Sequence, residues 1–286
     1  MPGGWHARLQ LRYWNDAGTG TPTTRAHDLH EGPLRVLQRL YPEGPAICHH
    51  VVVHPPGGIV GGDRLELEAT LGEGTHAVIT TPGAARYYRS DGAPGTQRVR
   101  LALDAGARLE WLPMEAIAYS GCLADNRLEL ALAPGAQMMG WDVLALGLPA
   151  SNQAFEAGVV QQHLELPGHW LERGRIAADD RLLRDSPLGL GGALVLATAW
   201  WAEGQPIARE RRQRLLDAAR EHTEPLAPVP GAALRAGVTS PHERVIVLRA
   251  LATRVEPAMQ LLQRVRAAWR AEAWGLAAQP PRIWRT

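Results

Sequence analysis

The chain has 286 residues, enough for one large all-β domain or two small ones, and its apolar fraction of 45% and charged fraction of 21% are those of a globular protein. Its 30 basic residues, all of them Arg, nearly balance 29 acidic residues, which argues against nucleic acid or an anionic membrane as a partner. The absence of Lys also excludes Schiff-base and P-loop lysine chemistry.

The cysteines indicate a reducing compartment. Cys48 and Cys122 are the only two and form no CxxC pair, so neither a disulfide framework nor a structural zinc site is expected. Arg8, Arg12 and Asp16 come too early to leave an apolar signal sequence. The longest uncharged run, residues 186–202, is shorter than the ~20 residues that span a bilayer and indicates buried strands. We therefore expect a cytoplasmic protein.

Strand patterns dominate from about residue 5 to residue 202. Four segments share one order of strand, Gly turn and strand, and begin at Leu65, Val99, Leu128 and Gln162. Their turn glycines, Gly74, Gly106, Gly135 and Gly168, are 32, 29 and 33 residues apart. This spacing predicts one supersecondary unit that is stacked repeatedly, in a β-solenoid or a pair of stacked sheets. Hairpins of an ordinary β-sandwich that recur by chance are the alternative.

The last third of the chain changes character. Residues 206–222 predict a helix whose basic face either meets an acidic partner or is solvated. Residues 232–252 predict a hairpin. Residues 256–273 predict a second helix, which packs on the sheet through an apolar stripe of Leu261, Leu262, Val265, Ala268 and Trp269. We expect all of these elements to form a single domain, 1–286.

Acidic residues recur along the predicted stack. The glycine-rich stretch before Asp63 is followed by a strand and not by a helix, so it predicts tight turns and no phosphate loop. Asp63 itself either caps this turn or lines an internal path for a cation. With Glu110, Asp142 and Glu172 it could form a polar column, which requires salt bridges or a water-filled passage. A glycosidase-type pair of acids is a further alternative.

Two other groups are candidate contact sites. Cys48, His50 and His54 share strand parity, but residues four apart on a strand lie about 13 Å apart, so we expect transient metal contacts and no closed site. The second group combines aromatic and Arg side chains, which are enriched at protein interfaces, and is a candidate partner-binding patch: Arg86, Tyr87, Tyr88 and Arg89.

Five motifs together resemble the UreD family of urease accessory proteins, also called UreH. They are YPEGPAICHHVVVHPPGGIVGGDRL, TTPGAARYYRS, LEWLPMEAI, WDVLALGLP and PRIW. The resemblance extends from about Trp5 to the C-terminus and is weakest over residues 203–243. It implies a mainly β fold, a stacked two-layer β-helical (solenoid-like) sheet with two helices in the C-terminal third.

The resemblance also implies a function. Members bind UreF, which recruits the GTPase UreG, and a dimeric assembly formed through UreF docks on apo-urease. The resemblance also implies a tunnel through the UreD protein that carries Ni²⁺ in transit, and no tightly bound cofactor. Asp63 in VGGD, Asp142 in WDVLALG and Glu172 in LERGRI match the tunnel-lining acids of the family. Ala85 departs from the pattern, since many members have Ser there.

Three functions remain open from the sequence. The first is a scaffold and nickel conduit for urease maturation, which is not itself an enzyme. The second is a metallochaperone that stores nickel at Cys48 and His54. The third is a carbohydrate-active β-solenoid enzyme, which would need two carboxylates that converge in one pocket.

Overall fold

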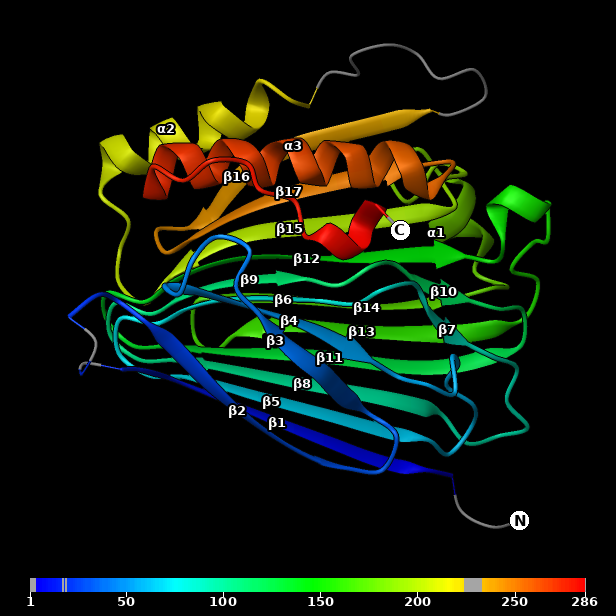
Figure 1. Ribbon diagram of the computed structural model, residues 1–286. Coiled ribbons are helices and arrows are strands. Elements are labelled where there is room, and N and C mark those ends of the chain that lie inside the picture. The colour runs from blue at the N-terminus through cyan, green and yellow to red at the C-terminus, as the bar shows by residue number, and fades with distance from the viewer. Residues whose placement is uncertain (1–3, 17, 19, 224–232, 286) are drawn as a thin grey trace.

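The computed structural model describes residues 4–16, 18, 20–223 and 233–285, and it confirms the predicted fold class. Two large sheets lie face to face, and two helices cover part of the outer side of one of them (Figure 1). The helices expected in the last third are α2 (Arg209–Arg220) and α3 (Val255–Trp274). A third helix, α1 (Arg181–Asp185), has only five residues and was not predicted.

The first sheet has seven strands, of which the five central ones are parallel and the two edge strands, β14 and β2, are antiparallel to their neighbours. In spatial order the strands are β14 (Trp170–Ala177), β13 (Gly158–Leu166), β11 (Cys122–Leu132), β8 (Gly95–Leu103), β5 (Arg64–Leu71), β1 (His6–Asn15) and β2 (Thr24–Glu31).

The second sheet has ten strands, with a parallel centre formed by β12, β9, β6 and β4. In spatial order its main path is β16 (Leu234–His242), β17 (Val245–Ala252), β15 (Val195–Glu203), β12 (Gln137–Leu146), β9 (Arg108–Leu112), β6 (His76–Thr80), β4 (Ile47–Val53) and β3 (Arg35–Leu40). The short strands β10 (Ala116–Ala118) and β7 (Ala85–Tyr87) continue from β12 beside this path.

Three of the four predicted units stack as expected, and each crosses from one sheet to the other, so the alternative of sandwich hairpins is wrong for them. β5, β8 and β11 belong to the first sheet, whereas the strands that follow their turns, β6, β9 and β12, belong to the second. The turn glycines Gly74, Gly106 and Gly135 lie against one another in a ladder, each with a φ near +70 to +84°. The fourth unit differs, because β13 and β14 pair as a true hairpin and Gly168 lies outside the ladder.

The glycine ladder gives a first testable prediction. Gly106 has a φ of +69°, a region in which a Cβ is strained. We expect Gly106→Ala to lower the free energy of unfolding by about 1–2 kcal/mol, measured by denaturant titration. Gly174→Ala is the matched control, since a Cβ there meets open space and its φ is not in the strained region. Equal effects of the two substitutions would contradict this account of the turns.

Two apolar cores hold the layers together. The larger core lies between the sheets and includes Leu9, Leu67 and Leu128 from the first sheet and Trp200 from the second. The smaller core lies between the second sheet and the helices, and α3 contributes most of its predicted stripe, including Leu261, Leu262, Val265 and Trp269. Among the described helices none is long and apolar enough to cross a membrane, and the uncharged run 186–202 forms a turn and the buried strand β15.

Candidate functional site

Three of the four recurring acids face the space between the sheets. Asp142 shares its face of β12 with the core residues Met138 and Leu144, and Glu172 on β14 shares its face with Trp170 and Ile176. Asp63 precedes β5 and has the parity of Leu65 and the other core residues of that strand. Glu110 is the exception, because it points from the opposite face of the second sheet toward α3.

Asp142 and Glu172 belong to a band of polar side chains that crosses the apolar core. In the first sheet Gln97, Asn126 and Gln162 are register neighbours on adjacent strands. In the second sheet Asp142, Thr198 and Arg249 are register neighbours on β12, β15 and β17. We call these six residues and Glu172 the polar layer. The sequence did not single out its neutral members, although Asn126 and Thr198 occupy inward positions of otherwise apolar strands, which is the signal that could have found them.

Asp142 is half-buried in this layer, where it also lines a cavity, and its hydrogen-bond partners are neutral. The side-chain amide of Asn126 donates a hydrogen bond to Asp142 Oδ2 over 2.9 Å, and the amide of Gln162 donates to Oδ1. Burial raises the pKa of Asp142 to about 6, and the nearby charge of Glu172 adds to the rise while both amides oppose it. No ion pair of Asp142 with a cationic side chain is found among the described residues.

Glu172 is the second acid of the polar layer and has a cationic partner. Thr198 Oγ1 donates a hydrogen bond to Glu172 Oε1 over 3.0 Å, and Arg249 Nη2 lies 2.7 Å from Glu172 Oε2. The side chain of Glu172 is 12% exposed and that of Arg249 is 60% exposed. Burial raises the pKa of Glu172, and Arg249 and Thr198 counteract the rise. Glu172 therefore lies near the end of the layer that reaches solvent.

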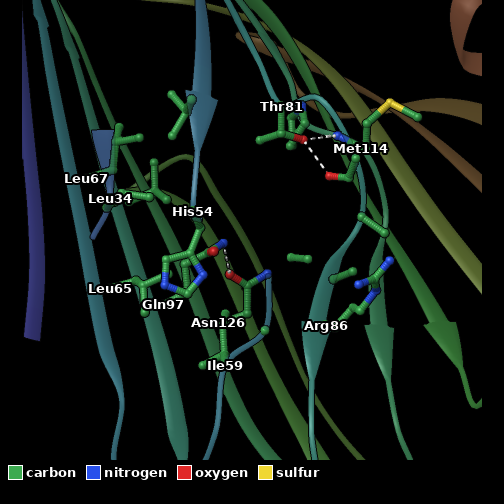
Figure 2. Close-up of a pocket in the computed structure, with 18 of the residues that line it drawn as sticks. Leu34, His54, Ile59, Leu65, Leu67, Thr81, Arg86, Gln97, Met114 and Asn126 are labelled. Atoms are coloured by element: carbon green, nitrogen blue, oxygen red, sulfur yellow. Dashed lines mark hydrogen bonds between the residues drawn. The ribbon is translucent and has the colours of Figure 1, made fainter. Parts of the chain in front are cut away.

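A cavity of about 260 Å³ lies at the other end of the polar layer. His54, Gln97, Asn126 and Asp142 line it together with mostly apolar residues. Figure 2 shows His54 beside Gln97 and Asn126, whose side chains are joined by a hydrogen bond of 3.3 Å. Burial lowers the pKa of His54, so its imidazole is neutral at neutral pH and has a lone pair available. Among the residues that the structure describes, Asp142 is the one acid of the lining, so they do not supply the convergent carboxylate pair of a glycosidase.

Asp63 caps the glycine-rich turn. Its Oδ1 accepts a hydrogen bond from the backbone N–H of Trp5 over 2.8 Å, and its Oδ2 accepts one from the N–H of Val60 over 3.0 Å. The residue is only 6% exposed and does not line the cavity described above, although its charge reaches His54. The structure thus shows the turn-capping role, and a part for Asp63 in a cation route stays a prediction.

The structure separates the candidate ligands of β4. Cys48 and His50 point into the inter-sheet core, whereas His54 lies beyond the strand at the cavity. Burial raises the pKa of the Cys48 thiol to about 11, and burial lowers the pKa of His50 to about 4, with its Nδ1 lying 2.6 Å from the Tyr13 hydroxyl. Within the described ranges no group of three or more His, Cys, Asp or Glu side chains could hold a metal ion. A tight nickel store on β4 thus has no support from the geometry.

The candidate patch of residues 86–89 is split between surface and interior. Arg86 and Arg89 are exposed, and Arg86 also lines the cavity. Tyr87 is 2% exposed and belongs to the inter-sheet core, and its hydroxyl has no hydrogen-bond partner in the described part of the chain. Tyr88 is half-buried and stacks edge-on against Tyr119, with ring centroids 4.9 Å apart. Only the two arginines present charged surface for a partner.

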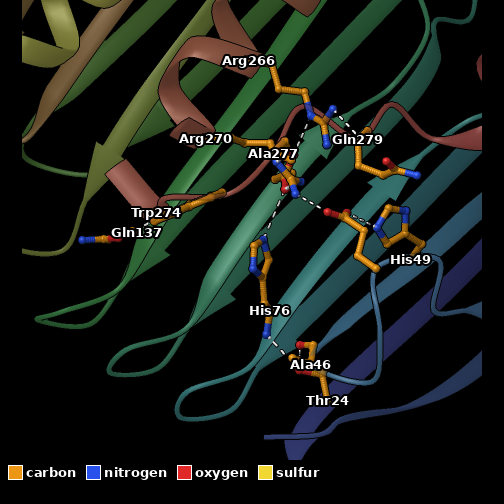
Figure 3. A network of polar contacts seen from close by, with 12 residues as sticks. Thr24, Ala46, His49, His76, Gln137, Arg266, Arg270, Trp274, Ala277 and Gln279 are labelled. Carbon is orange, nitrogen blue, oxygen red and sulfur yellow. Dashed lines mark hydrogen bonds and ion pairs between the residues drawn. The ribbon is translucent and has the colours of Figure 1, made fainter. Parts of the chain in front are cut away.

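Glu110 belongs to a buried ionic network that holds α3 on the second sheet. Its Oε2 lies 2.6 Å from Arg266 Nε, and its Oε1 contacts Arg270 and, at 3.3 Å, His76. Arg270 also contacts Glu43. Figure 3 shows Arg266, Arg270 and His76 of this network. Although burial opposes ionisation, Arg266 and the other partners hold the pKa of Glu110 at about 2. Glu110 is therefore salt-bridged and lies outside the column in which the sequence analysis placed it. The sequence did not identify the two arginines as its partners.

Comparisons with known proteins agree with the motifs. A model of the family described as UreD urease accessory protein matches residues 6–285. The chain is 57% identical to the urease accessory protein UreD of Leptothrix cholodnii over 282 residues that cover 99% of both proteins. It is 56% identical to that of Paracidovorax citrulli over 98% of this chain and 99% of the relative, and 51% identical to that of Albidiferax ferrireducens over the same shares. The chain therefore belongs to the UreD urease accessory protein family, as its motifs predicted, and is an accessory protein and not an enzyme.

Proposed function

We propose that this protein is a urease maturation scaffold that conducts Ni²⁺ through the polar layer to apo-urease. In this proposal its exterior binds apo-urease and UreF- and UreG-type accessory proteins, with a dimeric assembly formed through UreF. Family membership supports the role in urease maturation. The path of the metal is inferred from the chemistry of the core.

The observation that carries the proposal is Asp142. A buried carboxylate is costly unless a cation or several hydrogen bonds compensate it. Asp142 has two amide donors and no paired cation, and its pKa of about 6 shows that its ionised form is poorly stabilised. A carboxylate of this kind at a cavity is a candidate functional group, because it is available to a cation that enters.

The remaining members of the polar layer suit a cation in transit. Carboxylate, amide and hydroxyl oxygens are weak ligands for Ni²⁺ compared with thiolate or imidazole, and weak sites in series allow an ion to enter and to leave. Asp142 and Glu172 lie close enough for their charges to interact. Asn126 and Gln162 donate amide N–H groups to Asp142 and Thr198 donates its hydroxyl to Glu172, and a turn of these side chains would present their neutral oxygens to an ion. The neutral imidazole of His54 at the cavity offers a first contact.

The test is co-expression of the chain with urease subunits and with UreF- and UreG-type proteins in a host that lacks urease. We expect the combined substitution Asp63→Ala with Asp142→Ala to abolish urease activity and to leave the urease without nickel, as measured by elemental analysis. The pull-down of the partners should be retained, because both residues face the interior. Glu68→Gln, on the outward face of β5, is the matched control and should activate urease normally. Full activation by the double variant would refute the conduit.

A further inference from the structure

The outer end of the polar layer is occupied by an arginine. Along the row in the second sheet, Arg249 follows Asp142 and Thr198 on the next strand, and its neighbours on the same face of β17 are Val245 and Val247 of the inter-sheet core. Its guanidinium lies 2.7 Å from the Glu172 carboxylate. Among the described residues, Arg249 is the cationic member of the polar layer.

Both rows of the layer end in a glycine at the edge of their sheet. Gly237 on β16 pairs with Arg249, and Gly174 on β14 pairs with Gln162. A Cβ at either position would meet no atom within 4 Å, and both residues are exposed. The two edge strands thus carry no side chain at these positions, and we call the open space beside the two glycines the slot. Arg249 is 60% exposed and borders this space through its pairing with Gly237.

We propose that Arg249 is the resident counter-cation of Glu172, and that a divalent metal reaches Glu172 by displacing this arginine into the slot between Gly174 and Gly237. The inference deepens the proposed conduit and depends on it for the identity of the metal. An ion pair whose arginine is largely exposed is weak and is screened by salt, so a divalent ion can compete with it. If Arg249 were absent, the neighbouring carboxylates of Glu172 and Asp142 would have no compensating positive charge. The two would then attract a cation strongly.

This arrangement explains how the layer can carry a metal without storing it. While Arg249 is in place, Glu172 is neutralised and metal affinity is low. When the arginine moves out, Glu172 and Thr198 offer oxygens to the ion, and the tethered guanidinium remains nearby to compete for Glu172 again and favour release. Arg249 is therefore a positioning residue that sets metal affinity and does not itself bind the metal.

The test is Ni²⁺ binding by the purified full-length chain, measured by equilibrium dialysis at fixed ionic strength. We expect Arg249→Gln to bind Ni²⁺ about fivefold more tightly than the wild type, the scale of an exposed charge interaction. The gain should vanish in Arg249→Gln with Glu172→Gln. Arg8→Gln is the matched control, since Arg8 forms an exposed pair with Glu68 on the outward face of the first sheet, and it should leave the affinity unchanged.

A second variant distinguishes loss of the positive charge from misfolding. Arg249→Lys keeps the positive charge, so its affinity should stay within about twofold of the wild type. The proposal is overturned if Arg249→Gln binds Ni²⁺ no more tightly than the wild type, if the gain persists without Glu172, or if Arg249→Lys gains as much. Urease activation tests the conduit separately from the counter-cation. If the double variant Asp63→Ala with Asp142→Ala activates urease, the conduit is refuted. A gain in Ni²⁺ affinity that depends on Glu172 would still establish Arg249 as the counter-cation.

Discussion

Replacing Asp142 with Asn should reduce urease activation at least tenfold and, at the same time, stabilise the protein above pH 6. Asn has nearly the shape of Asp but cannot become an anion, so it removes the one carboxylate of the polar layer that has no cationic partner. Gln162 can rotate its amide to accept a hydrogen bond from the new side chain. Loss of function with gain of stability is the expected signature of a group that is kept for its activity.

The pH dependence of this effect has a defined sign. Burial raises the pKa of Asp142 from 3.8 to about 6, so its protonated form favours the folded state. That contribution is fully present below about pH 4 and is lost as the pH rises through about 6. The wild type is then destabilised by about 3 kcal/mol at neutral pH, at the conversion of ~1.4 kcal/mol per unit. Asp142→Asn should be more stable by up to this amount at pH 7.5 and should match the wild type near pH 4.

Denaturant titrations at pH 4 and pH 7.5 measure this difference, and nickel content measures the function. Asp125→Asn is the control, because Asp125 lies on the outward face of the neighbouring strand β11 and pairs with Arg127. Asp125→Asn should change the free energy of unfolding by less than about 1 kcal/mol and should leave urease activation unchanged. A variant Asp142→Asn that activates urease normally, or that is less stable than the wild type at pH 7.5, would refute the role given to this residue.

Removing Glu110 should have the largest effect on stability. Glu110→Ala removes the ion pair of Arg266 and leaves Arg270 with Glu43 alone. Both arginines are buried side chains of α3, and breaking a buried ion pair in this way costs about 3–5 kcal/mol. Thermal and denaturant unfolding should both show the loss. Arg8→Ala, which breaks the exposed pair with Glu68, should cost less than about 1 kcal/mol.

Two further results would support this reading of the network. Glu110→Leu combined with Arg266→Met removes one charge of each sign, leaves Arg270 paired with Glu43, and should recover part of the stability that Glu110→Ala loses. Because its partners hold the pKa of Glu110 at about 2, below its ordinary value of 4.5, its contribution is present above pH 4.5 and is lost as the pH falls toward 2. A loss under 1 kcal/mol for Glu110→Ala would show that α3 is held by its apolar face alone.

Local patterns were sufficient to predict the type of each main element. Alternating apolar residues predicted the strands, the glycines at 74, 106 and 135 predicted turns that require a positive φ, and the stripe around Leu262 predicted that α3 packs on the sheet. They did not reveal that the strands on either side of these turns belong to different sheets. A hairpin and a crossing turn have the same local sequence, and only the packing of the whole stack distinguishes them.

The site divides in the same way between sequence and tertiary structure. By itself the sequence determined the family through its motifs, and the motifs singled out Asp63, Asp142 and Glu172. It did not determine which acids face inward, because it placed Glu110 in the same column and the structure places Glu110 on the opposite face of the second sheet. Only the tertiary structure decided their partners: backbone amides for Asp63, neutral amides for Asp142 and Arg249 for Glu172. These partners come from strands far apart in the chain, and their register depends on how the sheets pack, which no local pattern records.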